Sequence, residues 1–152
     1  MAGTSNYTAI LAAVVARLDA ITGTGVIHAR TRLTHDWTTF IANFVTAGNV
    51  LGWTVSRRAT SERHLTSLEN EREYIFRLRG YMQINDAAAT ETTFQEMIED
   101  VCDDFRETYT LDATAELAEP PQVLTVEERA FASVLCHYCE IEIRCIERIA
   151  GG

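Results

Sequence analysis

The sequence predicts a single α+β domain over residues 1–152, in which two main helices pack on one face of a mostly antiparallel four-stranded sheet. Three observations predict this two-layer fold. Two segments repeat apolar residues with the 3.6-residue period of a helix. Three of four strand-like segments alternate apolar and polar residues, as half-buried strands do. The length of 152 residues and the apolar fraction of 47% suit one globular domain with a core.

The first third of the chain predicts a helix, a strand and a short helix. Apolar residues at helical spacing predict a helix over residues 7–21, which ends at the glycine-rich segment 22–25. Residues 26–33 alternate and can form a strand. Helical spacing over residues 37–45 then predicts a short helix that closes near Gly48.

Two strands and a long loop are expected in the middle of the chain. Residues 50–58 direct Leu51, Trp53 and Val55 to one face, and residues 72–84 alternate in the same way. Residues 59–71 between these strands are polar and exceed the length of a tight hairpin loop. We therefore expect a long loop at the tip of this hairpin.

The last third predicts the second main helix and the closing strand. Residues 90–109 form the clearest helical pattern, in which Thr92 and Gln95 fit a capping box and acidic side chains lie outside the apolar stripe. A loop that contains Pro120 and Pro121 follows. From Cys139 onward, apolar and charged residues alternate strictly, which predicts a strand with one buried face.

Three of the four cysteines lie in or beside this last strand. Cys136 and Cys139 are three residues apart, so in a regular strand they point to opposite faces and cannot bind one ion together. A structural zinc site also needs a second pair of ligands, and Cys102 lies alone inside a helical pattern. We expect no metal and no cofactor, with the cysteines acting as small apolar side chains of the core.

The charge of the chain is uneven. The net charge is −9, but residues 1–84 hold nine arginines and six acids, whereas residues 85–152 hold four arginines and sixteen acids. Such an acidic net charge argues against a protein that binds the phosphate backbone of nucleic acids. It fits either a solvated acidic helix or oppositely charged surfaces that meet head to tail.

Two surfaces are candidates for interaction with other proteins. The first is the polar hairpin tip with its flanking charges, which the strands would project beyond the sheet. Its residues are Arg57, Arg58, Glu62, Arg63, His64, Glu69, Glu71 and Arg72. The second is the charged face of the sheet, which is too polar to be buried without a charge-matched neighbour. Its residues are Arg30, Arg32, Arg77, Arg79, Glu140, Glu142 and Arg144.

No arrangement of residues predicts catalysis. The sequence has no phosphate-binding glycine loop after a strand, no nucleophile elbow and no HExxH motif. His35 and Asp36 fit a helix cap or a surface position better than an acid–base pair. No apolar run is long enough to span a bilayer, and the N-terminus lacks the pattern of a secretory signal. We expect that the protein is not an enzyme and does not bind membranes.

One long stretch is more specific than these periodicities. The segment YIFRLRGYMQINDAAATETTFQEMIEDVCDDF, residues 74–105, resembles the strand-to-helix core of tail terminator (tail completion) proteins of long-tailed bacteriophages. GWTVSRR upstream and PPQV…FASVLCHYCEIEI downstream follow in the order expected for that family, as does the first amphipathic helix. The resemblance spans roughly residues 7–147.

The resemblance implies a structural role in the virion. Family members form a six-fold ring on the last ring of tail-tube subunits, stop polymerisation of the tube and then offer a surface to the connector of the head. The implied partners are other copies of the chain in a hexameric ring, the major tail tube protein and a head-completion (neck) protein. DNA passes through the lumen without specific binding. The implied location is the head–tail junction of the virion, after assembly in the host cytoplasm.

Two other functions stay open at this point. A head-side neck adaptor would have similar features but would bind the connector first. A small thiol- or metal-dependent enzyme would use Cys136, Cys139 and Cys145.

Overall fold

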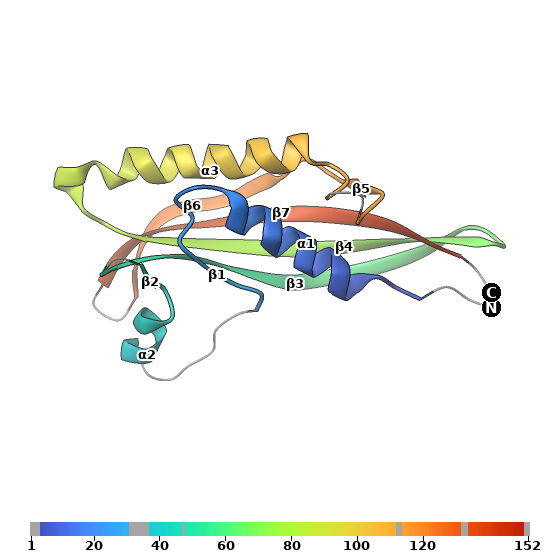
Figure 1. Cartoon of the computed structure of the whole chain (residues 1–152), viewed down its shortest axis with the longest axis horizontal. Coiled ribbons are helices and arrows are strands. Elements are labelled where there is room, and N and C mark those ends of the chain that lie inside the picture. The colour runs from blue at the N-terminus through green and yellow to red at the C-terminus, as the bar shows by residue number, and fades with distance from the viewer. Residues whose placement is uncertain (1–3, 31–36, 47, 112–113, 132–133, 151–152) are drawn as a thin grey trace.

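The computed structural model has an α+β fold, in which two long helices cover one face of a curved sheet (Figure 1). Helix α1 (Tyr7–Ala20) and helix α3 (Thr90–Glu107) form the helical layer, and the guanidinium of Arg17 on α1 pairs with the carboxylate of Asp104 on α3. The predicted fold class is confirmed at this level. The residues that the structure describes are 4–30, 37–46, 48–111, 114–131 and 134–150.

Three long antiparallel strands form the centre of the sheet. β3 (Asn49–Thr66) pairs with β4 (Glu69–Gln83), and β4 pairs along its whole length with β7 (Val134–Ala150). Each strand is longer than its apolar alternation predicts. Because β4 lies between two partners and under the helices, its side chains alternate between half-buried and buried over residues 73–80.

Short strands complete the two sides of the sheet. β1 (Val26–His28) pairs in parallel with β3, and β2 (Val45–Thr46) folds back on the start of β3. On the other side, β5 (Leu117–Ala118) and β6 (Gln122–Phe131) both pair with β7. The described sheet is therefore mostly antiparallel, as predicted, but it has seven strands, and the prediction of four was wrong.

The predicted long loop over residues 59–71 is also wrong. β3 and β4 continue through it as paired strands, and only Ser67 and Leu68 connect them. Backbone hydrogen bonds hold such a ribbon whether its side chains are apolar or not. The side chains are polar here because this end of the sheet extends past the ends of both helices (Figure 1).

The structure also differs from the prediction around β1 and at the start of α3. β1 ends at His28, so Arg30 lies in an exposed bend and not on a strand, while Arg32, His35 and Asp36 lie outside the described residues. Helix α3 begins at Thr90, and no side chain caps it, so the predicted capping box is wrong. The Thr90 hydroxyl instead accepts a hydrogen bond from the backbone N–H of Asn85 at 2.9 Å. The predicted short helix is present as α2 (Trp37–Ala42), but it ends three residues earlier than predicted, and Val45 lies in β2.

The main hydrophobic core lies between the helices and the sheet. It contains buried residues from one stripe of each helix, including Ile10 and Val14 of α1 and Phe94 and Phe105 of α3. The acidic side chains of α3 lie on its exposed side, as predicted. Burial of large apolar side chains contributes about 1.5–3 kcal/mol each, so this core is the main source of stability.

A second, smaller cluster lies on the opposite face of the sheet. Its buried residues are Phe44, Val50, Tyr81, Cys136 and Tyr138. Ile41 of α2 and Phe44, which follows α2, pack at this end of the face. The prediction that this whole face is charged is therefore wrong at one end, and the charged part lies toward the middle of the long strands.

Candidate interaction surfaces

The cysteines lie on opposite faces of β7, as the alternation predicts. Cys139 and Cys145 are fully buried in the main core, whereas Cys136 is buried in the second cluster. Cys102 of α3 also packs in the main core. The strand therefore holds Cys136 and Cys139 apart, and no group of three or more potential metal ligands occurs in the part of the chain that the structure describes.

Burial also makes these thiols poor nucleophiles. Desolvation raises the pKa of Cys136 to about 11 and that of Cys145 to about 12. The pKa of Cys139 is raised further for the same reason. A nucleophilic or metal-binding thiol needs its thiolate form, which a nearby cation or helix N-terminus usually stabilises. The environment here favours the neutral thiol, and this agrees with the interpretation of these cysteines as packing residues.

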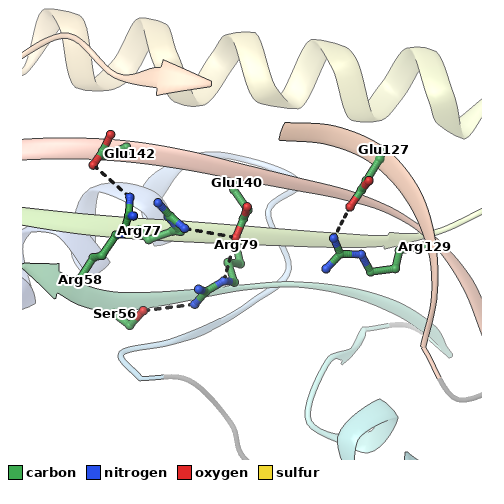
Figure 2. Close-up of polar contacts among 8 residues, drawn as sticks. All are labelled: Ser56, Arg58, Arg77, Arg79, Glu127, Arg129, Glu140 and Glu142. Carbon is green, nitrogen blue, oxygen red and sulfur yellow. Dashed lines mark hydrogen bonds and ion pairs between the residues drawn. The ribbon is translucent and has the colours of Figure 1, made fainter. Parts of the chain in front are cut away.

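The charged face of the sheet is centred on Glu140. Figure 2 shows that Arg77 and Arg79 of β4 both point toward this carboxylate, at 3.6 Å and 3.2 Å. The guanidinium of Arg79 also donates to the hydroxyl of Ser56 on β3, at 3.4 Å. Burial alone would raise the pKa of Glu140, but a hydrogen bond from Tyr138 and the two guanidinium groups hold it below the ordinary value.

Further ion pairs join the strands on the same face. Arg58 reaches Glu142 across β4 at 3.9 Å, and Arg144 pairs with Glu73 at 3.2 Å. Five of the seven residues predicted for this face therefore lie on it, and Arg58, predicted for the hairpin tip, joins them. Because these charges are already paired within the chain, they stiffen the sheet more than they offer free charges to a partner.

The residues predicted at the hairpin tip lie in a ribbon of cross-strand pairs. Arg63 pairs with Glu71 at 3.0 Å, and Arg72 lies 3.8 Å from Glu62. His64 contacts the side chain of Asn70 at 2.5 Å.

The remaining predicted tip residues tie the ribbon to the rest of the fold. Glu69 lies 3.9 Å from Arg148 at the end of β7. The guanidinium of Arg57 lies over the Tyr7 ring of α1, with 4.3 Å between its central carbon and the ring centroid. The sequence correctly selected charged residues in this region but placed them in a loop, whereas they form a stiff, paired extension of the sheet.

Sequence reasoning missed a third surface, the outer side of β6. This strand pairs only with β7 within the described residues, and its apolar side chains Val123, Leu124 and Val126 are each 42–43% exposed. The apolar run that follows Pro120 and Pro121 was the available signal. The loop predicted from the sequence extends only as far as Leu124, and over the rest of β6 the mostly exposed side chains show no clean alternation that would predict a strand.

Comparison of the chain with models of known protein families and with curated proteins finds no match in either case. Within its described residues, the structure contains no helix that is both long enough and apolar enough to cross a membrane. A functional proposal for this chain therefore depends on the sequence resemblance and on the geometry of its surfaces.

Proposed function

We propose that this protein is a structural subunit of a long-tailed phage virion, which forms a ring on the end of the tail tube, stops polymerisation of the tube and provides the surface that the head joins. The observation that carries the proposal is the end of the sheet formed by β3, β4 and β7, which projects past the helical layer (Figure 1). This projection coincides with the polar segment that the resemblance includes.

The paired charges of this projecting end suit a capping role. Arg63 with Glu71 and Arg72 with Glu62 hold adjacent strands together, so the ribbon can reach a neighbour without first becoming ordered. Exposed ion pairs contribute at most about 1 kcal/mol each. A single contact through such a surface is weak, but several identical contacts in a ring act together. Binding then depends on the correctly arranged end of the tube.

The helical layer provides a surface that DNA would not bind. The exposed side of α3 contains Glu91, Glu96, Glu99, Asp100, Asp103 and Glu107. Such a density of negative charge repels the phosphate backbone. If α3 faces the lumen of the ring, DNA would pass without adhering. This orientation is part of the proposal.

Tube assembly in vitro tests the capping function directly. The tail tube protein encoded in the same genome would be polymerised with and without this chain, and tube lengths measured in electron micrographs. The proposal expects shorter tubes, with extra density at one end of each tube. Tubes of unchanged length with bare ends would contradict it.

The same micrographs separate capping from a head-side function. A neck adaptor would leave the tubes bare but would bind purified heads or connectors. Extra density on heads, together with bare tube ends, would therefore contradict capping and indicate that the protein is a head-side neck adaptor.

A further inference from the structure

A groove beside helix α1 forms the first of two exposed apolar surfaces. This α1 groove is an open hollow of about 400 Å³ between the helix and the residue that follows β1. Its lining includes Leu11, Ala12, Val15, Ala16, Asp19 and Ala29. Helix α1 pairs with α3 through Arg17, and the groove lies on the flank of α1 next to β1 (Figure 1). Contiguous exposed apolar surfaces of this kind are candidate sites of contact with another protein.

The second surface is the β6 edge, defined as the outer side of residues 122–130. Val123, Leu124 and Val126 are each 42–43% exposed there. Val123 lies opposite Ile141 of β7 and Val126 lies opposite Cys139, and both partners are buried in the main core. Residues opposite each other on paired strands direct their side chains to the same face. Both valines therefore face the helical side of the sheet, where α3 leaves them partly uncovered.

The register of the sheet places the two surfaces at the same level along the strands, on opposite sides of the molecule. A ladder of paired residues runs across the sheet from β6 to β1, through Val126, Cys139, Gly80, Trp53 and Ile27. Val123 is level with Val55 in the same way, and Ala29 of the groove follows Ile27 by two residues in that direction. A second copy, rotated about an axis roughly parallel to the strands, therefore needs no shift along them to bring its groove to the β6 edge of the first.

The shapes of the two surfaces are complementary. Valine and leucine side chains project from the β6 edge, whereas alanines leave the α1 groove hollow. Helix α1 of a second copy would lie over β6, beside α3 of the first copy, and would cover Val123 and Val126. Removal of this apolar area from water is favourable.

The charges next to the two surfaces have opposite signs. Arg30 follows the groove residue Ala29, is exposed and makes no ion pair with another described residue. Glu119 lies just before β6, and it also makes no ion pair within the described part of the chain. The N–H of Glu119 donates to the carbonyl of Arg144, so both charges lie beyond the level of Val55, toward the projecting end of the sheet. Opposite charges at matching ends favour contact between the unlike surfaces.

We propose that the β6 edge of one copy packs into the α1 groove of a second copy, so that the helical layer continues from subunit to subunit. Because the two surfaces differ, each copy in a pair keeps one of them for a further neighbour. Such head-to-tail contacts generate a ring when the rotation closes. The inference rests on the proposed function only for the ring on which it would act, and it can be tested without tails.

Crosslinking tests the contact directly. Ala12→Cys protein is mixed with Val126→Cys protein at high concentration and treated with a short bifunctional maleimide; both positions are exposed. The proposal expects a crosslinked dimer in the mixture and little in either variant alone. In the matched control, Leu68→Cys at the exposed hairpin tip replaces Ala12→Cys and should give little dimer. Wild-type protein is the control for the four native cysteines, all of which are buried. Dimers within a single-variant sample, or no dimer in the mixture, would overturn the proposal.

A second measurement blocks one surface at a time. Ala12→Glu places a charge in the α1 groove, and Val126→Glu places one on the β6 edge. Each variant alone should show self-association at least tenfold weaker than wild type in sedimentation experiments, while unfolding curves show that it remains folded. An equal mixture of the two should recover a dimer and nothing larger, because each copy still has one intact surface.

Tyr109→Glu is the matched control for these charges, because Tyr109 is an exposed apolar residue outside both surfaces. It should associate as the wild type does. Ala12→Glu and Val126→Glu proteins that associate as strongly as wild type would overturn the proposal. A mixture that associates no more than its two components would also overturn it, whether or not the protein caps tubes.

Discussion

Gly80 shows how one residue of the resembling segment acts in the fold. A Cβ atom at this position of β4 would lie 2.8 Å from the ring of Trp53, which is fully buried on β3. Two heavy atoms do not approach that closely without displacement. The glycine in the Arg-Gly-Tyr sequence therefore lets the indole lie flat across the neighbouring strand.

We predict that Gly80→Ala lowers the free energy of unfolding by about 1–3 kcal/mol, the range for overpacking a core. Denaturant unfolding measures the loss. Trp53→Phe in the same chain relieves part of the clash, so the double variant should lose less than the sum of the two single variants. Additive losses would show that Gly80 does not act through Trp53.

The buried thiols predict tolerance of substitution. Cys136→Ser together with Cys139→Ala should leave the fold and its assembly intact, because neither thiol has a chemical role. The expected stability cost is about 1–2 kcal/mol per site. Unfolding curves and the tube assay measure the two properties separately. A variant that folds normally but cannot assemble would contradict the packing role.

The same thiols predict the response to alkaline pH. Their pKa values are raised in the folded state, so above about pH 9 the unfolded chain loses protons that the folded chain retains. The contribution of these thiols to stability should therefore be constant below that pH and be lost as the pH rises toward 11 or 12. Thermal unfolding between pH 7 and 11 checks the sign. The variant without Cys136 and Cys139 should show a shallower fall.

The alternation of β7 explains why the cysteines were predictable while the edge strand was not. A strand buried on one face shows a period of two in its sequence, and this pattern correctly assigned Cys136 and Cys139 to opposite faces. The side chains of β6 are exposed over most of its length, so its sequence lacks the alternation of apolar and polar residues that indicates a strand. Sequence patterns detect strands through burial, and an edge strand lacks much of that signal.

At the scale of elements, Glu147 joins the last strand to the first helix. Glu147 is buried. Its carboxylate accepts a hydrogen bond from the Tyr74 hydroxyl at 2.6 Å and another from the backbone N–H of Asn6 at 3.1 Å. Helix α1 has no side-chain cap at its N-terminus. The carboxylate of Glu147 therefore supplies negative charge at the N-terminus of α1, where the helix dipole favours it.

We predict that Glu147→Ala costs about 2–3 kcal/mol, because the Tyr74 hydroxyl and the Asn6 N–H would lose a charged acceptor. Glu147→Gln should cost less, since it keeps an acceptor and loses the charge. Tyr74→Phe is the control that removes only one of the contacts. Equal unfolding midpoints for Glu147→Ala and the wild type would contradict this account.

The hairpin extension predicts a variant that separates folding from function. Residues 63–71 lie beyond the helices, so replacing them with Asn-Gly between Glu62 and Arg72 should preserve the core and close a tight hairpin. The proposed function expects that this variant no longer caps, and that tails grow too long or remain without heads. Micrographs of tails from cells that express it are the measurement. Tails of normal length joined to heads would show that the extension has no function in capping.

The elements were predictable where a helix covers the chain. α1, α3 and the covered parts of β3, β4 and β7 all show a period in the sequence, because one side of each is buried. Residues 63–71 lie beyond the helices, and their polar composition resembles that of a loop. Their strand conformation comes from the pairing of β3 with β4 and of β4 with the distant β7, neither of which an apolar pattern shows.

At the scale of the molecule, the surfaces predict weak self-association in free solution. Most charges on the exposed sheet face are already paired within the chain, and the apolar part of the β6 edge is small. A single subunit contact of this kind gives modest affinity, and ring closure adds the rest.

We therefore predict that free protein is a monomer or a weak oligomer, and that rings form mainly on the tube. Sedimentation over a range of concentrations measures this. A tight hexamer at nanomolar concentration would contradict the order of events, although it would be compatible with the capping function.

The position of β7 also determines when the chain can fold. This strand is the last in the sequence, yet it lies inside the sheet, between β4 on one side and β5 and β6 on the other. Until Val134–Ala150 has left the ribosome, β4 lacks one partner and the core lacks Ile141, Ile143 and Cys145. Domains generally fold as units during or after synthesis. This one cannot complete its core until β7 is available, so a chain truncated before Val134 exposes its core and is open to proteolysis.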